Sequence, residues 1–469
     1  MLSFPASLLT VVCGLASSAL AVFPLGLYPE ATKEFHPLGL QVPGTATEKR
    51  FQIIGVSYQP AGKDDDPLGD NKDTCLRDAA LMQRLGINTI HVHNVDPGAN
   101  HDDCASIFNA AGIYMIVDVV SNGSLDQAQP SKTYNKEYMK HVFGVMEAFK
   151  NYPNTAAFLI GEVIDEQTAK RTPEYIRAVQ RDMKDYMEKH IRRQILVGYS
   201  AVDVPEILEG PAKYMECDIF DYDDKYDYIM RTHSDFLALE SSSWCGDATS
   251  TSSGYDLLTQ FQNSSLAVFF SDVGCNHGQP RNFSEVQALY GDDMTKAFSG
   301  AFITEYYDLV AVNDSDTITL SVEYENLQNQ LSKLNLEHLE ESHTKPGYVR
   351  KPDCRTDLVS TKWSSASFHI PERADGIDDL IKNGTRDSVH IGKLLPVPLQ
   401  AELSQKVYDS KGNEVTGIKF TNLHDSYPYN TPVEYESSSE ESEDAAISVR
   451  ASLAGVLGAM VAMVLFLVL

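Results

Sequence analysis

Two acidic residues directly follow apolar runs of the chain. Glu162 is separated from the run Ala156–Ile160 by a single glycine, and Asp272 follows the run Leu266–Ser271. If these runs are parallel strands, both carboxylates lie at the strand ends where barrel enzymes carry their active sites. Two such carboxylates suit glycosidic bond cleavage, because one protonates the leaving oxygen while the other attacks the anomeric carbon or activates water. An acid after a strand also commonly caps the next helix, so both interpretations stay open.

The elements that must position these acids alternate regularly between Phe51 and Leu334. Helical stretches separate short apolar runs, and two helices are predicted from Lys136 to Tyr152 and from Pro173 to Arg192. Eight strand–helix repeats favour a (β/α)8 TIM barrel, with a doubly wound sheet as the alternative. Glu162 and Asp272 then end the fourth and seventh strands. The eight predicted strands are Phe51–Val56, Ile87–Val92, Ile113–Val119, Ala156–Ile160, Gln194–Gly198, Asp235–Leu239, Leu266–Ser271 and Gly300–Ile303.

Composition excludes several classes of function. The chain has 469 residues, 38 basic and 66 acidic side chains and a net charge of −28. A hydrophobic content of 43% is enough for a large core and excludes global disorder. The acid excess excludes a basic nucleic-acid-binding face and disfavours an anionic polymer as ligand, whereas a neutral glucan is compatible.

Both ends of the chain resemble processing signals. An apolar run followed by Ala19-Leu20-Ala21 predicts a secretory signal peptide over residues 1–21, with a buried N-terminal helix as the alternative. At the other end, the apolar run Ala451–Leu469 follows a Ser- and Glu-rich stretch. This layout favours a GPI signal over a transmembrane anchor. The candidate attachment residues are Asp444, Ser437, Ser438 and Ser439.

Cysteines and sequons fit a secreted chain. Removal of the signal peptide leaves six cysteines, an even number that implies three disulfides with fifteen possible pairings. No Cys-x-x-Cys pair or histidine cluster suggests zinc. We expect neither a metal nor an organic cofactor, because two carboxylates can do the chemistry alone. A hairpin is predicted around Asp409–Asn413. The candidate N-glycosylation sites are Asn122, Asn263, Asn282, Asn313 and Asn383.

The residues around Asp272 resemble a known motif. VFFSDVGCN at Val268–Asn276 is similar to FFSEYGCN of the fungal GPI-anchored β-1,3-glucanosyltransferases, glycoside hydrolase family 72. GVSYQP at Gly55–Pro60, DPLGD at Asp66–Asp70 and Trp244-Cys245-Gly246 also match the pattern of this family. The resemblance covers roughly residues 30 to 365.

The resemblance implies a barrel of the 4/7 glycosidase type that cleaves β-1,3-glucan with retention and re-ligates it to another glucan chain. It implies a role in cell-wall assembly on the outer leaflet of the plasma membrane or in the wall. Because no cysteine follows Cys354, it also implies a member without the cysteine-rich carbohydrate-binding module. The implied disulfides are Cys75–Cys104, Cys217–Cys354 and Cys245–Cys275.

The departures from the family pattern lie at the predicted reaction centre. The family's Gly-Asn-Glu-Val is Gly161-Glu162-Val163 here, and we align Glu162 with the acid/base; an ungapped alignment would place Val163 there. Asp272 replaces the nucleophilic Glu, and His91-Val92-His93 replaces Arg-Val-Tyr. The candidate substrate contacts are Tyr58, His91, His93, Asp118 and Tyr306. The alternatives are ordinary polar residues of the barrel rim for His91 and His93, and a core or rim aromatic for Tyr306.

Three functional hypotheses follow. The first is an active glucanosyltransferase with altered or reduced activity, the second a non-catalytic GPI-anchored glucan-binding wall protein, and the third a surface protein without a glycan ligand. The predicted organisation is a signal peptide over 1–21, the barrel over 22–365, a C-terminal extension over 366–426, a stalk with the GPI attachment region over 427–446 and a GPI propeptide over 447–469.

Overall fold

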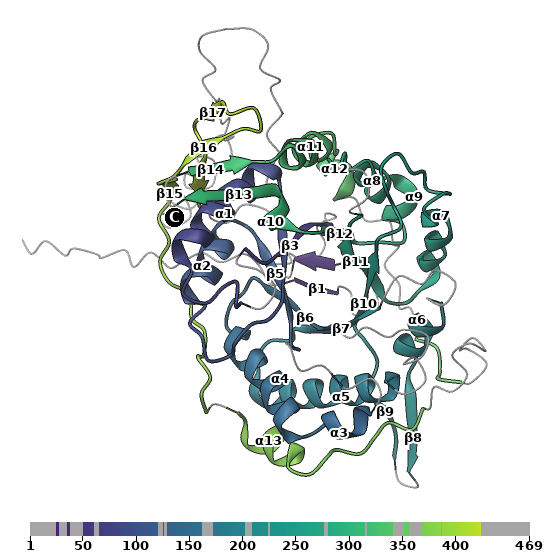
Figure 1. The fold of residues 1–469 in the computed structure, drawn as a ribbon. Coiled ribbons are helices and arrows are strands. Elements are labelled where there is room, and N and C mark those ends of the chain that lie inside the picture. The colour runs from purple at the N-terminus through teal and green to yellow at the C-terminus, as the bar shows by residue number, and fades with distance from the viewer. Residues whose placement is uncertain are drawn as a thin grey trace, which may run out of the picture. The chain divides into compact units, whose positions relative to one another are not determined.

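The computed structural model is shown in Figure 1. It describes residues 25–27, 35–37, 50–60, 65–120, 125, 129–161, 172–201, 209–223, 226–275, 280–314, 317–340, 351–355, 368–385 and 387–423. The chain divides into two compact units, Met1–Glu434 and Tyr435–Leu469, and all described residues belong to the first. Within the described ranges, we find no helix with the length and hydropathy needed to cross a membrane.

Eight parallel strands close into a barrel at the centre of the first unit (Figure 1). Their order around the barrel is their order in the chain, and the ring closes where β12 pairs with β3. This confirms the predicted (β/α)8 barrel and excludes the doubly wound sheet, which stays open. The strands are β3 (Ile53–Tyr58), β4 (Thr89–Val92), β5 (Tyr114–Asp118), β6 (Thr155–Gly161), β7 (Leu196–Ala201), β10 (Phe236–Ser241), β11 (Ala267–Val273) and β12 (Gly300–Ile303).

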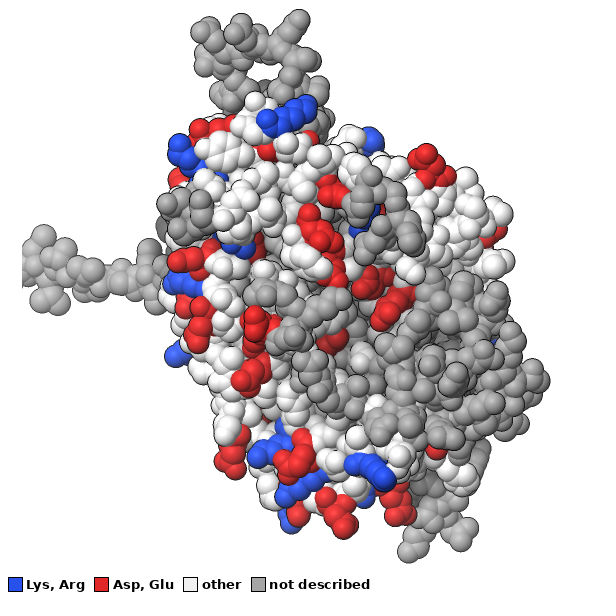
Figure 2. Space-filling model, viewed as in Figure 1, with Lys and Arg blue, Asp and Glu red and all other residues white. Residues whose placement is uncertain are grey.

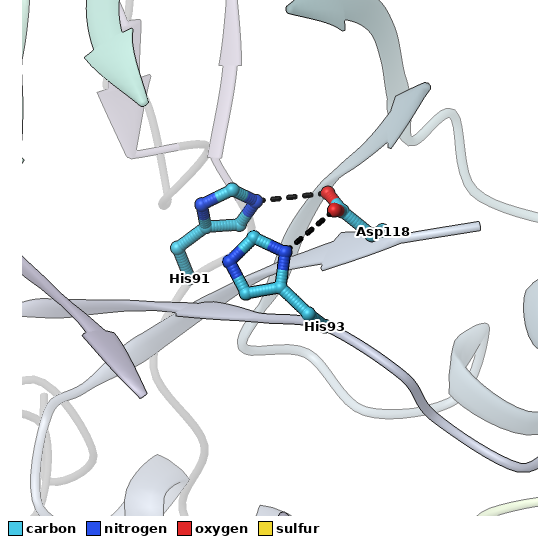
Figure 3. A group of neighbouring side chains, drawn as sticks. All are labelled: His91, His93 and Asp118. Atoms are coloured by element: carbon cyan, nitrogen blue, oxygen red, sulfur yellow. Dashed lines mark hydrogen bonds and ion pairs between the residues drawn. The ribbon is translucent and has the colours of Figure 1, made fainter. Parts of the chain in front are cut away.

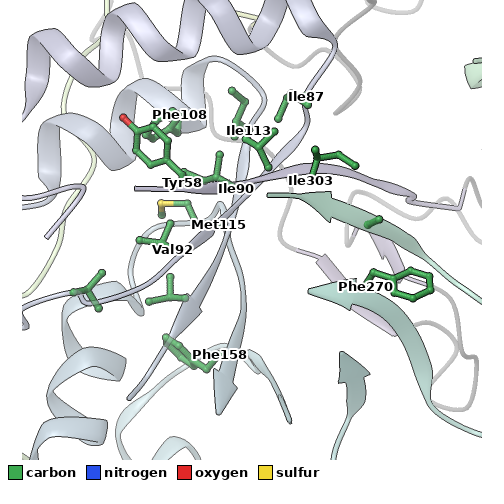
Figure 4. Close-up of a cluster of buried hydrophobic side chains, with 14 of the residues drawn as sticks. Tyr58, Ile87, Ile90, Val92, Phe108, Ile113, Met115, Phe158, Phe270 and Ile303 are labelled. Atoms are coloured by element: carbon green, nitrogen blue, oxygen red, sulfur yellow. The ribbon is translucent and has the colours of Figure 1, made fainter. Parts of the chain in front are cut away.

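The strands are apolar on both faces because each face is covered. Along β5, Tyr114 and Ile116 join a cluster with side chains such as Phe269, whereas Met115 and Val117 pack in the larger cluster that includes the helices. Figure 4 shows part of this larger cluster. Each fully buried aliphatic or aromatic side chain contributes about 1.5–3 kcal/mol relative to exposure, so the barrel is a rigid support for its loops.

Helices lie between the barrel strands. Asn135 caps α4 by accepting from the backbone N–H groups of Glu137 and Tyr138, and Pro173 stands in the first turn of α5. The two predicted helices are confirmed, although they end at Phe149 and His190. The helices are α1 (Lys72–Leu85), α2 (Asp102–Ala110), α3 (Pro130–Thr133), α4 (Lys136–Phe149), α5 (Pro173–His190), α6 (Glu209–Glu216), α7 (Tyr255–Leu258), the 3-10 helix η1 (Thr259–Asn263), α8 (Glu285–Leu289), α9 (Asp292–Thr295), α10 (Tyr306–Leu309), α11 (Val322–Leu331), α12 (Leu336–Leu339) and α13 (Ile377–Asn383).

Small sheets complete the fold, of which the four-stranded one is mixed because β14 and β16 run parallel. The segment after the barrel adds β16 beside β14 in a four-stranded sheet, and β16 turns back into β17 through Asp409–Asn413, which confirms the predicted hairpin. The remaining strands are β1 (Leu25–Leu27), β2 (Phe35–Pro37), β8 (Ile219–Asp223), β9 (Tyr226–Met230), β13 (Val310–Asp314), β14 (Thr317–Leu320), β15 (Gln400–Glu402), β16 (Lys406–Tyr408), β17 (Glu414–Val415) and β18 (Lys419–Thr421).

Three disulfides brace the barrel periphery and confirm the implied pairing. Cys75–Cys104 joins α1 to α2, and Cys245–Cys275 joins the segments that follow β10 and β11. Cys217–Cys354 closes the longest loop, with a sequence separation of 137 residues. Each cross-link restricts the unfolded chain, and typical disulfides stabilise by about 2–4 kcal/mol. The link after β11 holds the strand that carries Asp272.

Candidate active site

Asp272 lies at the carboxyl end of the seventh barrel strand, as the next-to-last residue of β11. Its register partner on β10 is Glu240, and the register shifts between Leu239 and Glu240. This irregularity places two carboxylates at matching positions on neighbouring strands. Both side chains are half-buried. Asp272 therefore lies where the sequence predicts, but beside an acid that the sequence analysis did not include in the site.

The surroundings of Asp272 favour its protonated form. Burial and the negative charges of Glu240 and Glu305 raise the pKa of Asp272 to about 7, although the positive charges of His93 and Arg281 act in the opposite direction. A carboxyl group with such a pKa changes its charge near neutral pH, which is typical of functional sites.

Arg281 supplies a fixed positive charge near this group. Its guanidinium donates to the backbone carbonyls of Thr304 and Val273 and pairs with Glu285 at 2.9 Å between Nη2 and Oε1. These bonds tie the loop after β11 to the end of β12, so the charge is held in place. Glu240, Glu305 and Arg281 are the residues that the sequence analysis missed; their positions at or after the ends of β10, β11 and β12 were the available signal.

A second group of titratable side chains stands at the ends of β4 and β5 (Figure 3). His91 Nε2 lies 2.8 Å from Asp118 Oδ1, and His93 Nδ1 lies 2.7 Å from Asp118 Oδ2. Strand side chains two residues apart share a face, which explains why both imidazoles reach one carboxylate. The ring centroids are 3.9 Å apart. The three predicted residues His91, His93 and Asp118 are therefore brought together.

Charge within this group is set by the shared carboxylate. Although burial opposes it, the two histidines hold the pKa of Asp118 well below its usual range. Burial alone would lower the pKa of His93, but Asp118 together with Asp272 and Glu240 raises it. Burial and the neighbouring His93 lower the pKa of His91. His93 is thus the electrostatic link between the Asp118 group and Asp272.

Glu162 lies outside the described residues, which end on this side at Gly161, the last residue of β6. A Cβ atom added at Gly161 would lie 2.9 Å from Asp118 Oδ2, which is closer than real Cβ contacts allow. Glycine at 161 therefore allows the close approach of β6 to the Asp118 carboxylate, and a larger residue would have to displace that side chain.

Tyr58 and Tyr306 do not have the direct sugar contacts expected of them. Both side chains are buried, at 0% and 1% exposure. Their hydroxyls donate to Asp78, at 2.9 Å from Tyr58 and 3.1 Å from Tyr306, and Arg77 donates to the same carboxylate from two nitrogens. A side chain enclosed in this way has no face for a ligand in this conformation, which agrees with the alternative of a core aromatic for Tyr306 and gives Tyr58 the same environment. They belong to the scaffold.

Acidic side chains also gather on the outside of the molecule. On the face in Figure 2, Asp and Glu cluster over the region where β10, β11 and β12 lie in Figure 1, whereas Lys and Arg lie mainly toward the edges of the view.

Four of the predicted glycosylation asparagines, Asn263, Asn282, Asn313 and Asn383, are exposed. The predicted sites outside the described residues are Asn122, Asp444, Ser437, Ser438 and Ser439.

Comparison with known proteins identifies the family. A family model described as glucanosyltransferase, of glycoside hydrolase family 72, matches residues 30–335. The 1,3-beta-glucanosyltransferase gel2 of Aspergillus fumigatus is 48% identical over 448 residues, covering 92% of this chain and 90% of gel2. The probable 1,3-beta-glucanosyltransferase GAS3 of Saccharomyces cerevisiae is 39% identical over 370 residues, covering 74% and 70% of the two chains.

Among solved structures, Gas2p of Saccharomyces cerevisiae in complex with laminaritetraose and laminaripentaose is similar. Its TM-score is 0.62 at 27% identity, covering 76% of this chain and 75% of that chain. The likeness agrees with the family match. The chain belongs to the glucanosyltransferases of glycoside hydrolase family 72.

Proposed function

We propose that this protein is a β-1,3-glucanosyltransferase that cleaves β-1,3-glucan and re-ligates the released chain to a second glucan. The names of the relatives support this activity. The titratable side chains at the carboxyl ends of the barrel strands support it as well. The single observation that carries the proposal is the position of Asp272 at the carboxyl end of the seventh barrel strand. This is where a retaining glycosidase of the 4/7 type needs its nucleophile.

The proposed reaction has two steps at one anomeric carbon. In the first, the ionised Asp272 carboxylate attacks the anomeric carbon, and Glu162 gives its proton to the leaving glycosidic oxygen. A glucosyl ester on Asp272 and a shortened glucan result. In the second, Glu162 takes the proton from a hydroxyl of an acceptor glucan, and that oxygen displaces Asp272. One β-1,3 bond is broken and one is formed, with net retention.

The shorter side chain at the nucleophile position sets the expected rate. Asp272 has one methylene fewer than the Glu of the family motif, which retracts its carboxylate by about one C–C bond, or ~1.5 Å. Retaining enzymes hold their two carboxyl groups about 5–5.5 Å apart, and a misplacement of ~1 Å can cost on the order of 10²-fold. We therefore expect activity below that of relatives with Glu at this position.

The proposed location is the cell surface. The N-terminal signal pattern and the C-terminal apolar run support secretion followed by GPI attachment near Asp444 or within Ser437–Ser439. Three disulfides and four exposed sequon asparagines in the described part of the chain fit an oxidising, glycosylating route. Neutral β-1,3-glucan of the wall is then both donor and acceptor.

Product analysis tests the proposed activity. The full-length protein is incubated with reduced laminari-oligosaccharides of one length, and the products are separated by size. Transfer gives products both longer and shorter than the substrate, whereas simple hydrolysis gives only shorter ones. Unchanged substrate after long incubation at high enzyme concentration would overturn the proposal.

A second candidate is a glucan-binding wall protein without catalysis. The observation in its favour is the pKa of about 7 at Asp272, because a protonated carboxyl group cannot attack an anomeric carbon. This candidate requires laminari-oligosaccharide binding by calorimetry without any product. Binding should then be unchanged in the Asp272→Asn protein, and a protein with neither products nor binding would remove both candidates.

A further inference from the structure

We propose that His91, His93 and Asp118 form a binding site for one divalent transition-metal ion of the zinc type. The site goes beyond the proposed glucan transfer, which needs no metal, and it departs from the expectation of a metal-free protein. Two imidazoles and a carboxylate converge at the ends of β4 and β5, and their nitrogen and oxygen atoms all lie within 4.8 Å of one another (Figure 3).

The ligand types match borderline metals. Zinc and its neighbours in the first transition row prefer imidazole nitrogen with carboxylate oxygen, whereas magnesium and calcium prefer oxygen alone. Three protein ligands with a further position for water or another ligand are the pattern of open zinc sites. His93 is half-buried, with 30% of its side chain exposed, whereas His91 and Asp118 are 5% and 9% exposed. The cluster is therefore enclosed but open on the His93 side.

The hydrogen bonds of His91 point to a cation between the rings and the carboxylate. Its Nδ1 lies 3.2 Å from the backbone oxygen of Ser271, and its Nε2 lies 2.8 Å from Asp118 Oδ1. Both partners are acceptors, but a neutral imidazole carries only one N–H. In a neutral His91 ring, the nitrogen without a proton would therefore point its lone pair at the lone pair of an acceptor oxygen, and the two repel each other. A cation bound to Nε2 removes this conflict and leaves Nδ1–H to donate to Ser271.

The contact with Ser271 also has a role around a metal. Metal-bound histidines usually donate their second ring nitrogen to a carbonyl or carboxylate, which fixes the ring and its tautomer. The Ser271 carbonyl on β11 holds His91 in this way, with Nε2 turned toward Asp118. A single ion would satisfy both imidazoles and the carboxylate together, whereas without an ion the buried His91 ring needs a proton on both nitrogens and therefore a positive charge.

Only a small adjustment is needed to admit the ion. The nitrogen–oxygen distances are 2.8 Å and 2.7 Å. Ligand atoms around a tetrahedral zinc ion with bonds of about 2.0–2.1 Å are ~3.3 Å apart. Each pair must therefore separate by about 0.5 Å. Rotation of the half-buried His93 ring can lengthen its own distance, and a turn of the Asp118 carboxylate away from His91 must lengthen the other.

Direct metal binding tests this proposal. The full-length protein, purified without a histidine tag and stripped with a chelator, is titrated with Zn²⁺ by calorimetry and with Co²⁺ by visible absorption. We expect one saturable site per chain, and intense visible bands of four-coordinate Co²⁺ that Zn²⁺ then abolishes. A zinc-edge anomalous peak between the three side chains would locate the ion.

Two variants and a control assign the site. The double variant His91→Arg/His93→Tyr carries the pair found in the family motif and should lose the one-to-one site. His93→Gln, at a half-buried position, should also lose it. The matched control is His101→Gln, because His101 Nε2 contacts Asp66 Oδ2 at 2.7 Å in a separate buried pair. That variant should bind as the parent does.

The outcomes are separable from those for glucan transfer, because the readouts are heat, colour and anomalous scattering. Thermal melting of each chelated variant confirms that it is folded. If the parent shows no saturable binding, the cluster holds protons only and the proposal is overturned. Equal binding by the parent and a folded double variant would overturn it as well.

Discussion

Two buried aspartates, Asp78 and Asp118, differ in the partners that hold them. Asp78 is fully buried and accepts four hydrogen bonds, two from Arg77 and one each from Tyr58 and Tyr306. Asp118 is 8% exposed and is held by His91 and His93. One carboxylate therefore has a permanently charged partner and two neutral donors, whereas the other has two imidazoles that can exchange protons or bind a metal.

This difference indicates that the Asp78 group stabilises the barrel, whereas the Asp118 group belongs to the candidate active site. Burial and the charge of Asp78 raise the pKa of Tyr58 well above its usual range, and the pKa of Tyr306 is raised likewise, so both phenols stay neutral at physiological pH. The Asp118 group couples through His93 to Asp272, whose pKa is about 7. Changes around Asp78 should therefore cost stability, and changes at the strand ends near Asp272 should cost activity.

The largest expected effect is on activity at Asp272. Asp272→Asn removes the nucleophile, so glucan transfer should fall by on the order of 10³-fold or more while the melting temperature changes little. Transfer rates are measured by size separation of products. The matched control is Asp293→Asn on α9, whose side chain is 89% exposed and should be dispensable. Undiminished transfer in Asp272→Asn would remove this residue from the mechanism.

The next effect is on stability at Asp78. Asp78→Ala leaves the buried Arg77 guanidinium without its carboxylate, and breaking a buried ion pair in this way costs about 3–5 kcal/mol of unfolding free energy. Chemical denaturation measures it. A loss below about 1 kcal/mol would show that the group is not the rigid scaffold described here.

A smaller loss is expected at Tyr306. Tyr306→Phe removes one hydrogen bond to a charged carboxylate and keeps the ring, so the cost should be about 1.5–3 kcal/mol. Denaturation curves of this variant and of Tyr307→Phe give the comparison between a buried and an exposed hydrogen bond to a carboxylate, because the exposed Tyr307 hydroxyl bonds Glu305. If Tyr306→Phe instead abolished transfer in a stable protein, the assignment of Tyr306 to the scaffold would be wrong.

The smallest effect is a shift in pH dependence. Because the pKa of Asp272 is about 7, the reactive carboxylate is lost as pH falls below 7, and transfer should decrease about tenfold per pH unit on the acid side. Glu240→Gln removes a negative neighbour, lowers this pKa and should move the acid limb to lower pH by up to about one unit.

The pH profiles of transfer are recorded with a chelator present, so that a bound metal cannot contribute to this shift. The exposed Glu337→Gln on α12 serves as the control. If the acid limb of the pH profile does not move in the Glu240→Gln protein, or moves to higher pH, this would contradict the electrostatic coupling between Glu240 and Asp272.

The barrel could be predicted from sequence because its signals are local. Each strand is a short apolar run, and all eight predicted runs coincide with barrel strands to within a few residues. The position of Asp272 followed from the same rule, since an acid after the seventh run must lie at the mouth. The disulfide pairing did not follow from spacing; it came from the resemblance, and the structure confirms it.

What could not be predicted depends on contacts between distant residues. Tyr58 lies 20 residues before Asp78 in the chain and Tyr306 lies 228 residues after it, and nothing local shows that their hydroxyls turn inward toward it. The pairing of Glu240 with Asp272 depends on a register shift in β10. The contact of His91 and His93 with Asp118 could have been predicted from the sequence. Strand residues two positions apart point to the same face, and β4 and β5 are neighbouring strands.

Trapping of the glycosyl-enzyme tests the central claim most directly. A laminari-oligosaccharyl fluoride with fluorine in place of the reacting sugar's 2-hydroxyl is incubated with the protein, and the adduct is located by peptide mass spectrometry. The account predicts one sugar adduct per chain on the peptide carrying Asp272, and none in Asp272→Asn. An adduct on another residue, or transfer to an acceptor without any adduct at Asp272, would contradict it.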